Sequence, residues 1–120
     1  MRIVHFEIPG KNLEKLAGFY DNVFGWKTQK WGGPEEYLLT TTGPDGEPGI
    51  NGAFFGSKEK ESIRIVIEVP SVDEYMKKIA AAGGKLLTEK QTIPGIGYTM
   101  LFEDIDGNMM DLLQNDPGAK

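Results

Sequence analysis

The segment Glu103–Gln114, EDIDGNMMDLLQ, decides the fold because its turn has a counterpart in the first half of the chain. A strand-like run at 98–102 precedes an Asp-Gly turn at 106–107, and a second apolar run at 109–113 follows it. Asp-Gly between two such runs predicts a β-hairpin. Asp111 lies inside the second run, where a carboxylate is out of place unless it faces solvent, a partner or a cavity.

The first half of the chain repeats this pattern. A second Asp-Gly turn, at 45–46, also separates two strand-like runs, and Glu7-Ile-Pro9 is echoed by Glu68-Val-Pro70. Each of these tripeptides ends an apolar run and precedes a helical pattern that stops at glycine. Because a repeated unit usually cannot bury its apolar face alone, we predict a single domain, residues 1–120, made of two similar halves at about 1–56 and 62–115.

Each half is predicted to run strand, helix, strand, strand, strand, which places the chain in the α+β class. Asn12 is a good N-cap and Gly25 a good C-terminal residue for the first helix, and Ser71 begins a capping box for the second. A Gly-Gly-Pro turn is expected at 32–34, and the tail, 116–120, is expected to fray. The predicted strands are 2–9, 26–31, 37–42, 50–55, 63–69, 85–90, 98–102 and 109–114.

The strand patterns predict that one sheet face in each half is polar. Period-two alternation places His5 and Glu7 opposite the apolar face of the first strand, and Arg64 and Glu68 in the matching places of the second half. Asp111 is a further candidate for this face. A helix covers the apolar face, so the polar face, curved by sheet twist, is typical of a ligand cup.

Composition excludes several classes of function. A net charge of −5 without a basic patch disfavours nucleic-acid partners. No stretch approaches the roughly 20 apolar residues of a membrane span. The absence of cysteine excludes disulfides, thiolate metal sites and cysteine nucleophiles. Without an export signal, a cytoplasmic location is expected.

The order of these elements, with four short motifs, resembles the vicinal oxygen chelate superfamily, the glyoxalase/bleomycin-resistance/dioxygenase group. The resemblance covers nearly the whole chain. The motifs are His5-Phe-Glu-Ile-Pro9, Phe19-Tyr20 with Phe24-Gly25-Trp26, Gly83-Gly84 before a strand, and Asp104-Ile-Asp-Gly-Asn108.

The resemblance implies two βαβββ repeats that pair into a curved mixed β-sheet with helices on the outer face, the glyoxalase/bleomycin resistance/dihydroxybiphenyl dioxygenase-like fold. The sheets of this family form a U-shaped trough, commonly in a homodimer. Metal-using members hold a divalent ion there, with one ligand from each of the first, fourth, fifth and eighth strands.

The resemblance also tests whether this chain keeps the metal ligands. His5 matches the first position and Asp111 the last, where Glu is usual. The other two positions fall on Arg64 and near Asn51 or Gly52, where the family has His or Glu. Arginine is a fixed cation that repels a divalent ion, and such sites need about three or four donors. We therefore expect no metal, with His5 and Asp111 as weak candidates.

Each candidate residue also has a structural interpretation. His5 either lines the cavity or is a hydrogen-bonded structural histidine, and Asp111 could simply pair with Arg64. Glu7 and Glu68 are solvated rim residues unless one is buried near substrate, where it could act as a general base or replace a metal ligand. The aromatic residues Trp31, Tyr37 and Tyr98 are expected in the core or at the rim.

The preferred hypothesis is a protein that binds a small organic molecule in a trough between the two repeats, without a metal. The expected ligand-binding residues are His5, Glu7, Asn51, Arg64, Glu68 and Asp111. One alternative is a divalent-metal-dependent lyase, isomerase or dioxygenase, so whether the chain is an enzyme stays open. Another is a non-catalytic dimeric module whose trough is filled by its own side chains.

Overall fold

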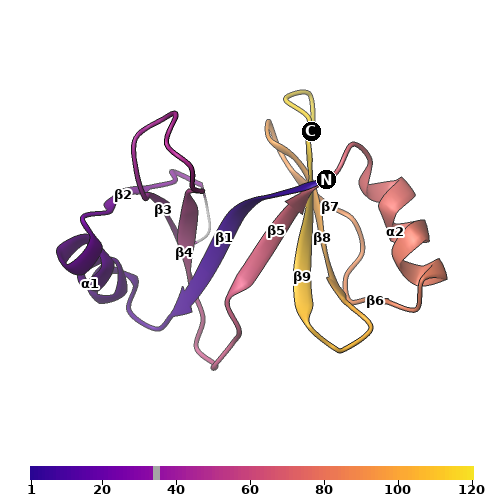
Figure 1. The fold of residues 1–120 in the computed structure, drawn as a ribbon, viewed down its shortest axis with the longest axis horizontal. Coiled ribbons are helices and arrows are strands. Elements are labelled where there is room, and N and C mark those ends of the chain that lie inside the picture. Colours follow the sequence, from indigo (N-terminus) through magenta and orange to yellow (C-terminus); the bar gives the residue numbers. More distant parts are fainter. Residues whose placement is uncertain (34–35) are drawn as a thin grey trace. The chain divides into compact units, whose positions relative to one another are not determined.

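The computed structural model describes residues 1–33 and 36–120, and these form two compact units. The first unit is residues 5–63, and the second is residues 64–120 together with 1–4. Figure 1 shows the elements of both. Pro34, the last residue of the predicted Gly-Gly-Pro turn, lies outside the described residues.

The first unit contains one helix and a four-stranded mixed sheet. Strand β1 is parallel to β4, whereas β4 with β3 and β3 with β2 are antiparallel, so the strands lie in the order β2-β3-β4-β1. The elements are β1 (Arg2–Gly10), of which residues 5–10 lie in this unit, α1 (Leu13–Phe24), β2 (Lys27–Lys30), β3 (Tyr37–Thr41) and β4 (Gly52–Gly56).

Helix α1 begins and ends at the residues that the sequence predicts. The side chain of Asn12 accepts a hydrogen bond from the Lys15 N–H at 3.1 Å, and Gly25 ends the helix with a φ of 73°. Glycine adopts this left-handed conformation without steric cost. Leu13 and Ala17 are buried against Phe54 of β4, so the helix covers one face of the sheet.

The second unit repeats this arrangement. Strand β5 is parallel to β9, and the order β6-β8-β9-β5 matches that of the first unit. The elements are β5 (Arg64–Glu68), α2 (Val72–Ala81), β6 (Lys85–Leu86), β7 (Gln91–Ile93), β8 (Gly97–Glu103) and β9 (Met109–Asn115). Ser71 caps α2 by accepting from the Glu74 N–H, and Val72 of the helix is buried in one core cluster with Val69, Met100, Phe102 and Leu112. The predicted α+β class is confirmed.

The predicted strand at 85–90 is wrong beyond Leu86. The N–H groups of Leu87 and Thr88 both donate to the Leu101 carbonyl, at 2.9 and 3.3 Å, and the Thr88 hydroxyl accepts from the Leu101 N–H at 3.0 Å. A side chain thereby takes the place of the next backbone bond, and the ladder stops. The strand β7, which the sequence did not predict, then pairs with β8 in its place.

The expectation that residues 116–120 fray is also wrong. Asp116 N–H donates to the Ile96 carbonyl, and Gly95 N–H donates to the Ala119 carbonyl, both at 2.8 Å. Ala119 is 4% exposed. The tail is therefore hydrogen-bonded to the segment between β7 and β8.

No helix in the described part of the chain is both long and apolar enough to cross a membrane.

Candidate functional site

The face of the first unit's sheet opposite α1 carries two of the predicted site residues. In β1, Ile8 packs against the core beneath α1, and the ring of Phe6 lies over Gly52, where an added Cβ atom would come within 2.5 Å of it. Because side chains alternate along a strand, His5 and Glu7 lie on the other face, as predicted.

Tyr37, the first residue of β3, joins these two side chains. Its hydroxyl group donates to Glu7 Oε2 at 2.5 Å and lies 2.8 Å from His5 Nε2. Strand β4 separates β1 from β3, and there Ala53 pairs with Glu7 on one side and Leu39 on the other. A methyl side chain at this position leaves room for Tyr37 to reach across. We call His5, Tyr37 and Glu7 the polar cluster.

Burial sets the protonation of His5. The imidazole is partly buried, and loss of solvation lowers its pKa below the ordinary value of 6.5, while the negative charge of Glu7 opposes that shift. Burial is the larger effect. His5 is therefore neutral at pH 7 and above, with one ring nitrogen protonated and the other carrying a lone pair.

An aromatic ring borders the polar cluster. Trp31 meets the Tyr37 ring edge-on, with 5.5 Å between centroids. Tyr37 was expected only as a core or rim aromatic, so sequence reasoning missed the role of its hydroxyl group. Strand alternation could have placed Tyr37 on a face, but its reach across β4 depends on register.

The predicted residues of the second unit form separate contacts. Asp111 is 9% exposed and accepts a hydrogen bond from the Thr99 hydroxyl at 2.7 Å. Glu68 accepts from the amide group of Asn115. Arg64 lies on β5, and its pairing with Asp111 stays a prediction. These contacts satisfy part of the hydrogen-bonding capacity of both carboxylates.

Asn51 has a local role in the first unit. Its side-chain oxygen accepts from the Thr42 N–H at 2.9 Å, and the Thr42 hydroxyl donates to the Ile50 carbonyl at 2.6 Å. These bonds close the connection between β3 and β4. The amide group therefore has a structural function whether or not it also contacts a ligand.

The described His, Asp and Glu side chains can be compared with what a divalent metal ion requires. Such a site needs about three or four protein ligands. Across residues 1–33 and 36–120, no three His, Asp or Glu residues gather as a metal site would require. Nε2 of His5 is also engaged by Tyr37. Within either unit, the described residues therefore supply no such ligand set, and metal independence stays a prediction.

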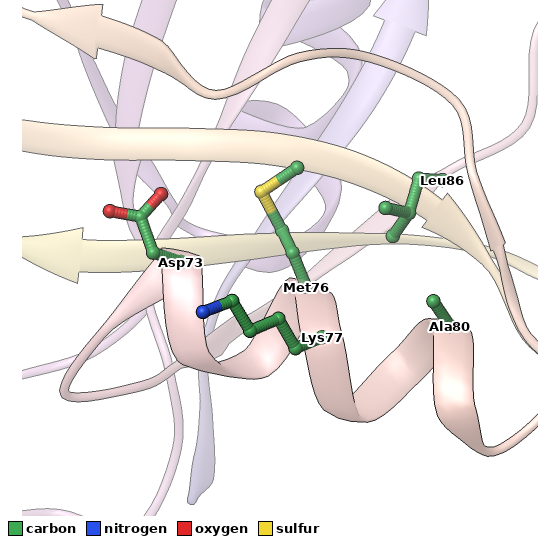
Figure 2. Close-up of a pocket in the computed structure, with 5 residues that line it drawn as sticks. All are labelled: Asp73, Met76, Lys77, Ala80 and Leu86. Atoms are coloured by element: carbon green, nitrogen blue, oxygen red, sulfur yellow. The ribbon is translucent and has the colours of Figure 1, made fainter.

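A depression of about 540 Å³ lies elsewhere, against α2 (Figure 2). Met76 extends from the helix toward the strands, and the charged groups of Asp73 and Lys77 lie along the same helix. Asp73 also pairs with Lys90 at 2.9 Å. The lining residues are Asp73, Met76, Lys77, Ala80 and Leu86. None of them is a predicted site residue.

Comparisons with known proteins place this geometry in context. A profile of the Glyoxalase/Bleomycin resistance protein/Dioxygenase superfamily matches residues 2–112. A glyoxylase-like domain-containing protein from Didymella fabae is 27% identical over 113 residues, which is 89% of this chain and 88% of that protein.

Solved structures with the same fold share little sequence. Methylmalonyl-CoA epimerase from Mycobacterium tuberculosis superposes with a TM-score of 0.71 at 14% identity, over 96% of this chain and 88% of that one. A glyoxalase/bleomycin resistance protein/dioxygenase superfamily member from Vibrio splendidus 12B01 superposes with a TM-score of 0.66 at 15% identity, over 95% of this chain and 98% of that one. At these identities the likeness establishes the fold alone.

Proposed function

The chain belongs to the Glyoxalase/Bleomycin resistance protein/Dioxygenase superfamily, and from that premise we propose that it binds a small organic molecule without a metal. The binding surface is the sheet face that carries His5, Tyr37 and Glu7. The observation that supports this most directly is the polar cluster itself, in which two side chains of β1 meet the hydroxyl group of Tyr37 from β3.

A purely structural role explains the polar cluster less well. Burying a neutral histidine and a carboxylate together costs solvation free energy, and an apolar pair of the same size would pack at lower cost. The aromatic ring of Trp31 beside Tyr37 adds apolar contact area. Polar groups converging next to apolar surface are typical of small-molecule sites.

Ligand binding can be tested by thermal shift with a library of small aromatic alcohols, amines and thiols. A ligand that binds only the native state raises the melting temperature, by an amount that grows with its concentration. His5→Gln should weaken the shift for any ligand at this face. Asn108→Ala, in the β8–β9 turn, serves as a control for general stability changes. No stabilising compound in a broad library would favour the non-catalytic module instead.

A second candidate is a metal-dependent lyase, isomerase or dioxygenase. The structural likeness to a methylmalonyl-CoA epimerase supports it at the level of fold. His5 and Asp111 would be ligands there, and Glu7 or Glu68 would move a proton. Stoichiometric divalent metal in protein purified without chelator would support this alternative, and its absence after reconstitution would remove it.

Three further proposals concern the whole chain. Residues 1–120 form one domain of two repeats, the protein is a homodimer, and it is located in the cytoplasm. The span of the superfamily profile, residues 2–112, supports the single domain, and the family resemblance supports the dimer. Light scattering at several protein concentrations tests the dimer directly. Roles for Asn51, Arg64, Glu68 and Asp111 in ligand binding likewise stay predictions.

A further inference from the structure

We infer that the polar cluster offers a ligand only hydrogen-bond acceptors, so that the molecule bound there must bring O–H or N–H donors. The inference rests on the proposed function and narrows its ligand class. The two acceptors are Nδ1 of His5 and Oε1 of Glu7. Tyr37 is the positioning residue that produces this arrangement.

The argument begins with the single proton of the Tyr37 hydroxyl group. That proton is donated to Glu7 Oε2 at 2.5 Å, and an ionised carboxylate can only accept. The contact of 2.8 Å between the same hydroxyl oxygen and His5 Nε2 therefore needs a proton on the histidine. Tyr37 thus holds neutral His5 in the Nε2–H tautomer.

These two hydrogen bonds use both donors of the polar cluster, the Tyr37 O–H and the His5 Nε2–H. A neutral imidazole with a proton on Nε2 carries a lone pair on Nδ1. In the part of the chain that the structure describes, neither Nδ1 of His5 nor Oε1 of Glu7 makes a hydrogen bond. The cluster is left with two open acceptor atoms and no open donor.

This distribution of protons selects among ligands. An alcohol, an amide N–H or an ammonium group can satisfy the open acceptors. A carboxylate placed at the same position would meet two lone pairs and the charge of Glu7, with no donor to offset the lost hydration. A carbonyl or ether oxygen would also find no donor. At this cluster, donor ligands are favoured over anions.

The tautomer can be measured without any ligand. Long-range ¹H–¹⁵N spectra at pH 8 should show His5 protonated on Nε2, with a slowly exchanging Nε2–H signal. Tyr37→Phe should abolish the protection of that proton while the protein stays folded, because the ring contact with Trp31 remains. Tyr20→Phe removes a hydroxyl group on the helix side of the sheet and should leave the signal unchanged. A proton on Nδ1 in the wild type would overturn the inference.

The ligand class is tested with benzyl alcohol, benzyl methyl ether and benzoate, which differ at one group. Benzyl alcohol at millimolar concentration should shift the His5 Nδ1 resonance, and the ether and benzoate should not. Glu7→Gln removes the charge and supplies an amide donor, so it should raise the affinity for benzoate at least several-fold. Stronger binding of benzoate than of the alcohol to the wild type, or no response of Nδ1 to the alcohol, would overturn the donor-ligand inference.

The two proposals fail in different ways. If the tautomer is as inferred but no compound in a broad library stabilises the protein, the proposed binding function fails and the proton arrangement stands. If ligands bind at this face but prefer the anionic probe, the binding function stands and the inferred ligand class fails.

Discussion

The contacts of Tyr37 depend on the register in which its strand pairs with the neighbouring strands. Alternation along the first strand is enough to place His5 and Glu7 on one face, and the structure confirms that placement. The contact of Tyr37 with both depends on the pairing of β3 with β4 and of β4 with β1. Those pairings join residues far apart in the chain, and no local pattern encodes them. The polar cluster could therefore be predicted only in part.

The lowered pKa of His5 predicts a pH dependence of stability. Because the folded pKa lies below the unfolded value of 6.5, the unfolded state binds more protons in the interval between the two. The His5 contribution to stability is complete above pH 6.5 and is lost as the pH falls through that interval. Urea unfolding of the wild type between pH 7.5 and 5 should show this loss.

The variant His5→Gln isolates that effect. It lacks the titrating group, so its stability should fall less steeply over the same pH range, whereas the carboxylates contribute equally to both proteins. Parallel stability curves for the two proteins would show that His5 is not perturbed.

A pair of glycine substitutions tests the packing beneath the polar cluster. Gly52→Ala would place a methyl group within 2.5 Å of the Phe6 ring, so it should cost about 1–3 kcal/mol of unfolding free energy through overpacking. Gly18→Ala lies in α1 with no atom within 4 Å of the added carbon and should instead stabilise by about 0.5–1 kcal/mol. Chemical denaturation measures both, and equal effects would contradict the assigned packing.

At the level of elements, the helices were more predictable than the short strands. Asn12, Gly25 and Ser71 are local signals, and each marks a helix end as expected. Strand β6 stops early because Thr88 bonds to Leu101, which belongs to another element. The order of the tail could not be predicted for the same reason, because its partners Gly95 and Ile96 cannot be read from the composition of residues 116–120.

The cap of α1 gives a prediction at this scale. Asn12→Ala removes the acceptor for the Lys15 N–H and should lower the unfolding free energy by about 1 kcal/mol. Lys15→Ala keeps the backbone donor and should change stability by less than about 0.5 kcal/mol. Thermal and urea unfolding of the two variants check this, and an equal loss in both would argue against the cap.

The C-terminal tail gives another prediction at the scale of elements. Deleting residues 116–120 removes two backbone hydrogen bonds and the buried Ala119, so it should cost about 2 kcal/mol. Hydrogen exchange should show faster exchange at Gly95, whose N–H loses its acceptor. An unchanged melting temperature would show that the tail frays after all.

For the whole molecule, the repeated order of elements along the chain could be read from the sequence. The echo of Glu7-Ile-Pro9 in Glu68-Val-Pro70, with the two Asp-Gly turns, predicted two equivalent halves, and both units have the same strand order. The site could be predicted less completely than the fold, because the sequence supplies candidate residues without their hydrogen-bond partners. Position along a strand says which face a side chain joins but not which atoms it meets.

Metal independence is a prediction for the whole protein. Dialysis against a chelator should leave the melting temperature and the affinity for a donor ligand unchanged, because the described residues of neither unit gather three metal-ligating side chains. Added Zn²⁺, Mn²⁺ or Ni²⁺ should restore nothing. A loss of binding that stoichiometric metal reverses would establish the metal-dependent alternative.

The parallel pairing of β1 with β4 and of β5 with β9 also constrains how the chain folds. In each unit the strand made first is hydrogen-bonded to the strand made last. A ribosome must therefore release nearly a whole unit before its opening strand finds its neighbour, and closing such long loops slows folding. Until then the opening strand has an unpaired edge, and such an edge can pair with another chain.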